Sequence, residues 1–504
     1  MKKYILLSGL IFASSLAFAQ KEFDALKYSL TDINGTARYV SMSGAFGALG
    51  GDMTTLSNNP AGIAVFRSSE LSISPALVST STKSVFNGLG SSDSKKNLLI
   101  NNFGYVGSFR TYDESAISNF NFGVSYNKIK DFNRNISIVG KNRSYSLLDR
   151  ICVDENSKDG SNLTDYAYET WLINKNSTSG HYEPILTSEN GVNEKVNNSM
   201  YMMENGGIGQ WDFSLGANYG HMFYFGMSVG VQNIDYELSS VYGEDFANGG
   251  GLELRNVLTT KGAGVNVKIG TIVRPFPNLR LGFAYNSPTY YQLTDVAMAS
   301  MTSLGLIDPK TNEKFAPNPY YDKPEESFDY QLITPSRLLY SMAYQFGQKG
   351  FLSLDCDVVD YRETSLKDSN GLPYGDINSY MNVDFRAAVN LRLGGEYRLN
   401  DNVSLRAGAA WYESPVKKTL ETSNTFIPTA GTTPQYSVEK DTYYLSGGIG
   451  YHVGGFFLDA ALQRQMRKEN FYNFFDGTEN ASYPKYAELS TNKNKLIVTM
   501  GFKF

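Results

Sequence analysis

From Leu71 to the end of the chain, apolar residues recur at every second position in one segment after another. Successive side chains of a β-strand point to opposite faces, so each segment predicts a strand with one continuous apolar face. No apolar run in this region is long enough for a membrane helix. Lipid offers no partner for unpaired backbone groups, so a membrane-spanning chain of this kind must close into a barrel. Two of the apolar faces are formed by Trp211, Phe213, Leu215, Ala217 and Tyr219, and by Leu496, Val498, Met500, Phe502 and Phe504.

The connections between these segments alternate between short and long. We count about fourteen strands, and bacterial outer-membrane barrels have an even number, with short periplasmic turns and longer external loops. A soluble sandwich has no reason to sort its connections in this way. We therefore predict an all-β fold, a transmembrane antiparallel β-barrel of about fourteen strands over residues 69–504, in the bacterial outer membrane. The short turns are expected at 220–221, 275–278, 348–350, 400–402 and 454–455, and the long loops at 80–101, 142–209, 239–256, 294–330, 364–384, 415–440 and 469–489.

The faces opposite the apolar ones carry charged residues. A lysine or arginine at the lipid midplane costs roughly 2–4 kcal/mol, so several of them would exceed a typical net stability of about 5–15 kcal/mol. These side chains must therefore face the lumen, where cross-strand pairs that stiffen the wall are a simpler role than ligand binding. They are Lys268, Arg280, Arg337, Asp355, Asp357, Arg386, Arg392, Glu396, Arg398 and Arg406.

The first residues have the form of a secretory signal. Lys2 and Lys3 precede an apolar stretch that ends in Ala17-Phe18-Ala19, so we predict a signal peptide over residues 1–19. The chain has 45 basic and 50 acidic residues, and this balance together with secretion argues against a nucleic-acid partner. Cys152 and Cys356 are too few for a disulfide framework, although the two could pair in an oxidising compartment. We expect a monomer in contact with outer-membrane lipid.

The segment before the first strand is rich in small residues. Residues 37–66 contain Gly44-Ala45-Phe46, Asp52 and Asn59-Pro60-Ala61-Gly62, and small residues allow close backbone packing. A barrel of this width would leak unless something filled its lumen. We therefore predict that residues 20–68 form an N-terminal plug, or hatch.

The sequence resembles the FadL-type outer-membrane transporters of long-chain fatty acids, which include toluene-uptake channels and proteins labelled hemin receptors. The resemblance begins at Gly44-Ala45-Phe46 and Asn59-Pro60-Ala61-Gly62 and continues through 262–275, 279–288, 334–336, 357–361, 392–397 and 405–415. It implies passive uptake of a hydrophobic ligand, captured by external loops. It also implies release by movement of the plug near Asn59 to Gly62, and exit sideways into the bilayer.

The longest predicted loop, 142–209, is unusually apolar for a segment outside the membrane. Exposed apolar surface marks a binding groove or a packed lid, and methionine adapts to irregular ligands. A loop that folds onto itself to cap the barrel would have the same composition. The candidate ligand-binding residues are Tyr166, Tyr168, Trp171, Leu172, Met200, Met202 and Met203.

The third predicted strand loses its alternation between Asn127 and Arg134, around Lys128, Lys130 and Asp131. Either the strand contains a bulge here or it leaves the membrane, and the second is the simpler interpretation. In FadL-type channels a kink in an early strand opens a hole in the wall, and these three residues are the best local candidate for it.

Other chemistry has little support. Gly226-Met227-Ser228-Val229-Gly230 matches the nucleophile elbow of hydrolases, but the elbow needs a strand-to-helix turn and this segment continues as a strand. His181, in the longest loop, is a weak candidate ligand for haem iron. We expect neither an enzyme nor a metal or cofactor, and we keep a hemin receptor or surface adhesin as the main alternative, with a lipid hydrolase second.

Overall fold

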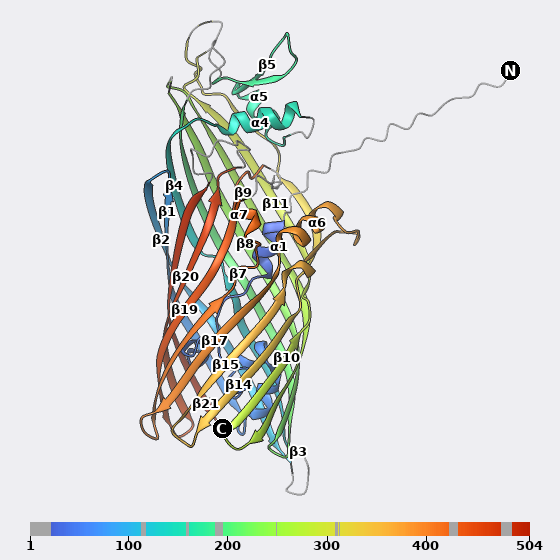
Figure 1. Cartoon of the computed structure of the whole chain (residues 1–504), viewed down its shortest axis with the longest axis vertical. Coiled ribbons are helices and arrows are strands. Elements are labelled where there is room, and N and C mark those ends of the chain that lie inside the picture. The colour runs from blue at the N-terminus through green and yellow to red at the C-terminus, as the bar shows by residue number, and fades with distance from the viewer. Residues whose placement is uncertain are drawn as a thin grey trace, which may run out of the picture.

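The computed structural model describes residues 22–111, 117–157, 161–186, 195–247, 249–307, 311, 313–422, 432–474 and 486–504. The predicted signal peptide therefore lies outside the described residues. Figure 1 shows a tall barrel with short helices above it and other helices inside it. Within the described part of the chain, no helix has the length and apolar character to span a membrane.

Fourteen antiparallel strands close the wall, which confirms the predicted fold and strand number. Each strand pairs with the next, and β21 pairs with β1 to complete the ring. Phe504, the aromatic last residue, exchanges two backbone hydrogen bonds of 3.0 Å with Ser69 at the lower rim. The wall strands are β1 (Glu70–Phe86), β2 (Leu89–Arg110), β3 (Ile117–Asp131), β7 (Val196–Tyr219), β8 (Phe223–Phe246), β9 (Gly251–Phe276), β10 (Leu279–Asn286), β14 (Arg337–Phe346), β15 (Gly350–Asp360), β17 (Ala387–Arg398), β18 (Val403–Tyr412), β19 (Tyr436–Val453), β20 (Phe456–Tyr472) and β21 (Ala487–Lys503).

The wall continues far above the lipid-facing zone, so several predicted loops are wrong. Residues 80–101 are the top of a β1–β2 hairpin that turns at Asn87 and Gly88, and β8 and β9 run on through most of 239–256. Their outward side chains above the membrane are polar, so the apolar alternation used to find strands disappears there although the strands continue. Further strands above the membrane are β4 (Arg134–Arg143), β11 (Tyr290–Leu304), β12 (Tyr320–Asp322), β13 (Glu326–Ile333) and β16 (Ser365–Asp368).

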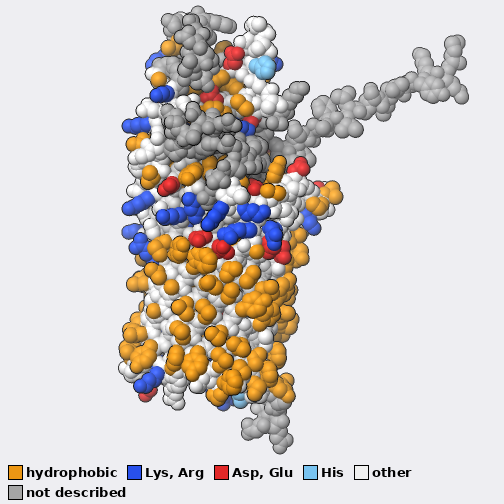
Figure 2. Space-filling view, viewed as in Figure 1, with side chains coloured by type: hydrophobic (Ala, Val, Ile, Leu, Met, Phe, Trp, Pro, Cys, Tyr) orange, Lys and Arg blue, Asp and Glu red, His pale blue; other side chains and the backbone are white. Residues whose placement is uncertain are grey.

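Apolar side chains cover the outer surface of the lower wall, and a belt of charged side chains lies directly above them (Figure 2). Trp211, Phe213 and Leu215 on β7 are 41–52% exposed, and so are many of the outward residues predicted to face lipid. This arrangement is the one expected for an outer-membrane barrel, with apolar residues outward and polar residues inward.

Small elements sit at the upper end of the barrel. Residues between β4 and β7 fold into two helices and a two-stranded sheet, and this connection is shorter than the predicted loop 142–209 because β4 reaches Arg143 and β7 starts at Val196. The elements are α4 (Leu147–Asn156), α5 (Thr164–Glu169), β5 (Ile173–Lys175), β6 (Tyr182–Pro184), η2 (Tyr361–Glu363), α6 (Gly375–Asp384) and α7 (Thr419–Thr422).

The N-terminal segment, residues 22–66, lies inside the barrel. Its elements contact strands on different sides of the wall: α2 packs on β19 and β20, whereas η1 packs on β7 and β8. They are α1 (Glu22–Ser29), α2 (Ala37–Ser41), α3 (Thr55–Asn58) and the 3₁₀ helix η1 (Pro60–Val65), drawn in blue within the barrel in Figure 1.

Candidate functional site

The Asn59-Pro60-Ala61-Gly62 motif is fitted against glycines of the wall. The Asn59 amide nitrogen donates to the Gly47 carbonyl at 2.6 Å, and its amide oxygen accepts from the Ala61 N–H at 3.1 Å, which caps η1. A Cβ atom on Gly270 would lie 1.9 Å from the Asn59 oxygen, and one on Gly226 would lie 2.1 Å from the Pro60 carbonyl. The wall therefore has room for this motif only because both positions are glycine.

The Gly44-Ala45-Phe46 motif is held by a charged residue of the wall. The backbone N–H groups of Phe46 and Gly47 both donate to one carboxylate oxygen of Asp355, at 3.1 and 2.9 Å. Ala45 and Phe46 are fully buried, and Gly44 has a φ of 76°, which favours glycine.

Asp52 acts within the N-terminal segment. It accepts hydrogen bonds from the Thr36 hydroxyl at 2.7 Å and from the Thr54 N–H at 2.9 Å. The two motifs and Asp52 thus lie in one N-terminal segment that contacts the wall at several points.

Most of the predicted lumen charges are buried in ion pairs. Arg406 forms ion pairs with Glu396 and Asp459, each at 2.6 Å, and Glu396 also forms an ion pair with Arg38 of α2 at 3.0 Å. Each cation thus stands beside a carboxylate, as a buried charge requires. The remaining pairs are Lys268–Asp212 at 2.5 Å, Arg392–Asp355 at 3.7 Å, Arg337–Asp357 at 3.8 Å and, higher up, Arg386–Glu413 at 2.9 Å.

Two predicted lumen residues differ from the rest. Arg280 donates to the Leu49 carbonyl at 2.7 Å, and Arg398 is exposed at the lower rim. Sequence reasoning also missed Asp212 and Asp459, which have partners in the predicted set. The alternation could have found Asp212, because it lies between the outward Trp211 and Phe213.

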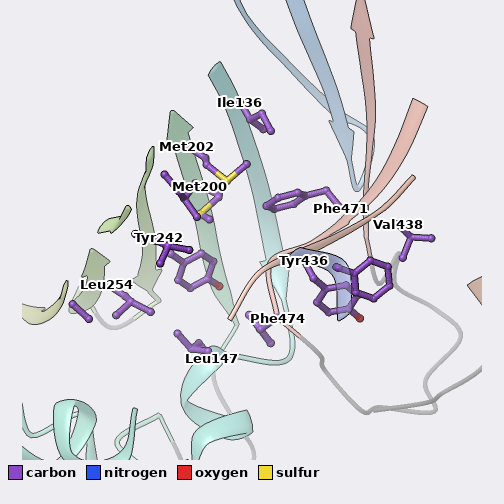
Figure 3. Close-up of a cluster of buried hydrophobic side chains, with 14 of the residues drawn as sticks. Ile136, Leu147, Met200, Met202, Tyr242, Leu254, Tyr436, Val438, Phe471 and Phe474 are labelled. Carbon is purple, nitrogen blue, oxygen red and sulfur yellow. The ribbon is translucent and has the colours of Figure 1, made fainter. Parts of the chain in front are cut away.

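The upper lumen is apolar and filled by side chains from many strands. Met200 and Met202 are 1% and 4% exposed, and in Figure 3 they share this cluster with Phe471 and Tyr436 from the other end of the sheet. They lie on β7 rather than in a loop, because β7 extends above the membrane and turns its even-numbered residues inward. Met203, on the opposite face of the strand, is only half-buried and does not join them.

The four candidates from the external connection divide into two pairs. Tyr166 and Leu172 are buried at 3% and 0%, and burial raises the pKa of Tyr166 to about 12. Tyr168 and Trp171 are 48% and 41% exposed, and the Trp171 ring lies 5.7 Å from the Phe315 ring. The structure therefore does not bring the seven predicted ligand-binding residues into one site.

The wall is interrupted beside the irregular segment of β3. Pairing between β2 and β3 covers Asn102 to Arg110 and stops at the Asn102–Asn127 pair, although β2 continues upward for another thirteen residues, 89–101. The register of β3 against β7 shifts between Lys128 and Lys130, and β4 then pairs with β7 alone. The upper β2 edge is therefore unpaired on this side within the described residues.

The same irregularity turns consecutive side chains inward. Lys130, Asp131 and Phe132 are 4–6% exposed, whereas a regular strand would bury only alternate residues. Lys128 remains half-buried. The Lys130 ammonium donates to the Lys27 carbonyl of α1 at 2.8 Å, and Asp131 pairs with Lys493 at 3.2 Å. The bulge thus connects the wall to α1.

A cavity of about 120 Å³ lies at this junction, between the apolar upper lumen and the charged lower lumen. Phe23 and Leu26 of α1, Phe132 and Leu238 supply apolar lining. Its charged lining includes Lys130 and Asp131 of the predicted kink. Arg134 and Glu204 were not foreseen from sequence, because they lie above the zone of apolar alternation. Arg134 pairs with Glu204 and, at 2.6 Å, with Glu469.

The residues that suggested a hydrolase or a hemin receptor do not form the site that either function would need. The Ser228 hydroxyl is buried and bonds Ser214 and Asp212, on a continuous strand. His181 is exposed in the β5–β6 connection, and both cysteines are free thiols. Among the described residues, no three His, Cys, Asp or Glu side chains are grouped to hold a metal ion.

A family model described as outer membrane protein transport protein (OMPP1/FadL/TodX) matches residues 219–504, more than half of the chain. The chain belongs to this family. The family places the barrel in the bacterial outer membrane, and its members are transporters, as the sequence resemblance implied. No curated protein matches the chain at a significant level.

Solved structures of the family share the fold. The Pseudomonas putida toluene transporter TodX is 15% identical with a TM-score of 0.51, and the match covers 94% of this chain and 100% of that one. A Pseudomonas aeruginosa FadL homologue is 14% identical with a TM-score of 0.50 over the same shares. At these identities the likeness concerns the fold alone.

Proposed function

We propose that this member of the family takes up hydrophobic small molecules, such as long-chain fatty acids, passively across the outer membrane. The observation that supports this best is the change of lumen character at the cavity beside Phe132. Above it the lumen is apolar, and below it the lumen contains buried ion pairs. An apolar ligand gains free energy in the first region and would lose it in the second.

Capture would occur in the upper lumen. The inward Met200 and Met202 belong to the buried apolar cluster of the upper lumen, and methionine side chains can repack around an irregular chain. The exposed Tyr168 and Trp171 offer a first contact at the outer surface. The α1 residues Phe23 and Leu26 line the cavity below, so a ligand that reaches it must displace part of α1.

The N-terminal segment would act as the plug. Its contacts with Asp355, Gly226 and Gly270 close the lower lumen in the resting state. Movement of Asn59 to Gly62 would shift the rest of the N-terminal segment, including α1, and the ligand would then be released. The barrel would work as a monomer in contact with outer-membrane lipid.

The exit would be lateral, through the gap between upper β2 and the β3–β4 bulge. Leu98 on the outer face of β2 is 76% exposed, more than Leu77, its neighbour on β1, at 50%. The β2–β3 pairing stops beside Lys130, Asp131 and Phe132, which line the cavity at the level where the lumen becomes charged. A lateral exit avoids the ion-paired lower lumen, which explains why the bulge lies at this height.

The uptake itself is tested in a strain from which the gene has been deleted. Uptake of radiolabelled fatty acids, aromatic hydrocarbons and hemin is compared with and without the restored chain. Restored uptake of a fatty acid or hydrocarbon supports the proposal. Restored uptake of hemin alone selects the hemin-receptor alternative, and normal entry of every compound without the chain rules out all of these roles.

The exit route is tested by filling the gap. In Asn97→Trp an indole is placed on the inner face of the unpaired β2 edge, and Ser94→Trp places the same group on the outer, exposed face of the same strand. We expect Asn97→Trp to reduce uptake to the level of the deletion strain, while Ser94→Trp remains normal. Normal uptake by a folded Asn97→Trp barrel would exclude the lateral route without excluding transport.

A further inference from the structure

A second cavity, of about 330 Å³, lies at the lower end of the barrel beneath the N-terminal segment. The segment forms its roof through Leu49, Gly50 and Gly51, and inward residues at the ends of the wall strands form its sides. The cavity is separate from the apolar path proposed above. Its charged lining consists of Arg38, Arg67, Arg280, Arg398, Lys503 and a single acidic residue, Glu70.

The charge balance of this cavity differs from that of the lumen above it. Lys503 pairs with Glu70 at 3.5 Å, and Arg38 pairs with Glu396. Arg67, Arg280 and Arg398 have no carboxylate within 4.0 Å among the described residues. Three guanidinium groups thus line one space at the lower rim, and none of them has a carboxylate partner among the described residues.

Like charges in a confined space repel one another, and a bound anion removes that repulsion. The planar guanidinium group donates two parallel hydrogen bonds to phosphate or carboxylate oxygens, which makes arginine the preferred residue for such groups. We propose that this cavity is an oxyanion site, open to the periplasm, that binds a phosphate group. The group comes from free phosphate or from the headgroup of a phospholipid in the inner leaflet.

The site is connected to the N-terminal segment. Arg280 donates to the Leu49 carbonyl at 2.7 Å, and Arg38 donates to the Gly51 carbonyl at 3.3 Å. A phosphate group bound between these arginines would hold them in place, and with them the turn at Gly50 and Gly51. Occupancy of the site therefore stabilises the segment in its resting position.

The test measures the thermal unfolding midpoint of the full-length chain in neutral detergent with added phosphate, against sodium chloride at equal ionic strength. Phosphate also stabilises folded proteins generally, by exclusion from their surface. The informative quantity is therefore the difference between the wild-type chain and Arg67→Gln/Arg398→Gln. Neither arginine holds the N-terminal segment, so this variant should fold. Arg464→Gln, on the outer wall, is the matched control.

A second arm replaces free phosphate by vesicles of phosphatidylglycerol, with phosphatidylcholine vesicles for comparison. We expect the specific stabilisation to be lost in Arg67→Gln/Arg398→Gln and kept in Arg464→Gln. Loss in the phosphate arm identifies free phosphate as the ligand, and loss only in the phosphatidylglycerol arm identifies the lipid headgroup. Equal midpoints for wild-type and double-variant chains in both arms would overturn the proposal. None of these outcomes depends on whether the protein transports a hydrophobic ligand.

Discussion

The lower and upper halves of strand β8 have opposite polarity. In the lower half, Phe225, Met227, Val229 and Val231 point outward and Gly226, Ser228 and Gly230 point inward. In the upper half, the outward positions hold Asn233, Asp235 and Glu237, and the inward positions hold Ile234, Tyr236 and Leu238. The alternation of the strand never changes, but the apolar set moves from its outer to its inner face.

The reversal shows that the surrounding medium decides which face of a strand is apolar. Lipid outside the lower wall requires apolar outward residues. The polar side chains of these strands therefore point inward, where they need partners in the lumen. Water outside the upper wall permits the arrangement of a soluble barrel, with an apolar core. The bulge at Lys130 and Asp131 and the cavity beside Phe132 lie where the two arrangements meet. A hydrophobic ligand that descends the upper core is thus brought to the lipid at the point where the lumen ceases to suit it.

The largest effect should come from breaking a buried pair of the lower lumen. Asp212→Leu leaves the Lys268 ammonium buried without its carboxylate, which should cost about 3–5 kcal/mol of unfolding free energy. Urea unfolding in lipid vesicles, followed by the gel-mobility difference between unheated and boiled protein, measures this cost. Lys268→Met in the same chain should recover much of it. A loss in the double variant as large as in Asp212→Leu would show that the pair itself is not the cause.

A charge added to the outer face should lower the unfolding free energy more in the lower half of the barrel than in the upper half. Phe213→Lys places an ammonium group against lipid and should destabilise the barrel by about 2–4 kcal/mol. Tyr201→Lys, on the same face of β7 but above the membrane, should change the unfolding free energy by no more than about 0.5 kcal/mol. The same vesicle assay compares them. Equal costs would mean that the lipid boundary does not lie between these two positions.

The change of medium also explains what the sequence could and could not predict. The strands were recognisable where an apolar outer face alternates with charges, as at Trp211 and Phe213, and this was enough for strand number and closure. Around the tip of the β1–β2 hairpin the exposed outward residues include Lys83, Ser92, Ser94 and Lys96, so the sequence there predicts a loop although both strands continue. The sequence places Met200 and Met202 in a loop for the same reason. The break in the alternation near Lys130 is visible in the sequence. The unpaired β2 edge beside it is not, because the register between two strands depends on residues that lie far apart in the chain.

A smaller effect is expected from the helix that covers the upper core. Ser146 caps α4, its side chain accepts from the Leu148 N–H at 3.1 Å, and its hydroxyl bonds Glu244 of β8. Ser146→Ala should cost about 1 kcal/mol, the usual value for a lost N-cap. Hydrogen exchange of the α4 amides should rise, while the lower wall strands remain protected. Faster exchange throughout the barrel would show that the two halves unfold together.

Chemical labelling of the two cysteines compares the upper and lower halves of the barrel without altering the stability of the protein. Burial under the upper core raises the pKa of Cys152 to about 12, and an unperturbed thiol titrates near 8.5. Thiolate is the reactive form, so at pH 8 a maleimide should label Cys152 very slowly in the folded chain and rapidly after denaturation, with the folded-state rate rising toward pH 12. Cys356 lies on the lipid-facing side of β15, opposite Tyr340 and Leu391. In vesicles a membrane-soluble maleimide should reach it while a charged maleimide does not. Rapid labelling of both thiols by the charged reagent would mean that neither the upper core nor the bilayer excludes water at these positions, and the contrast between the halves would fail.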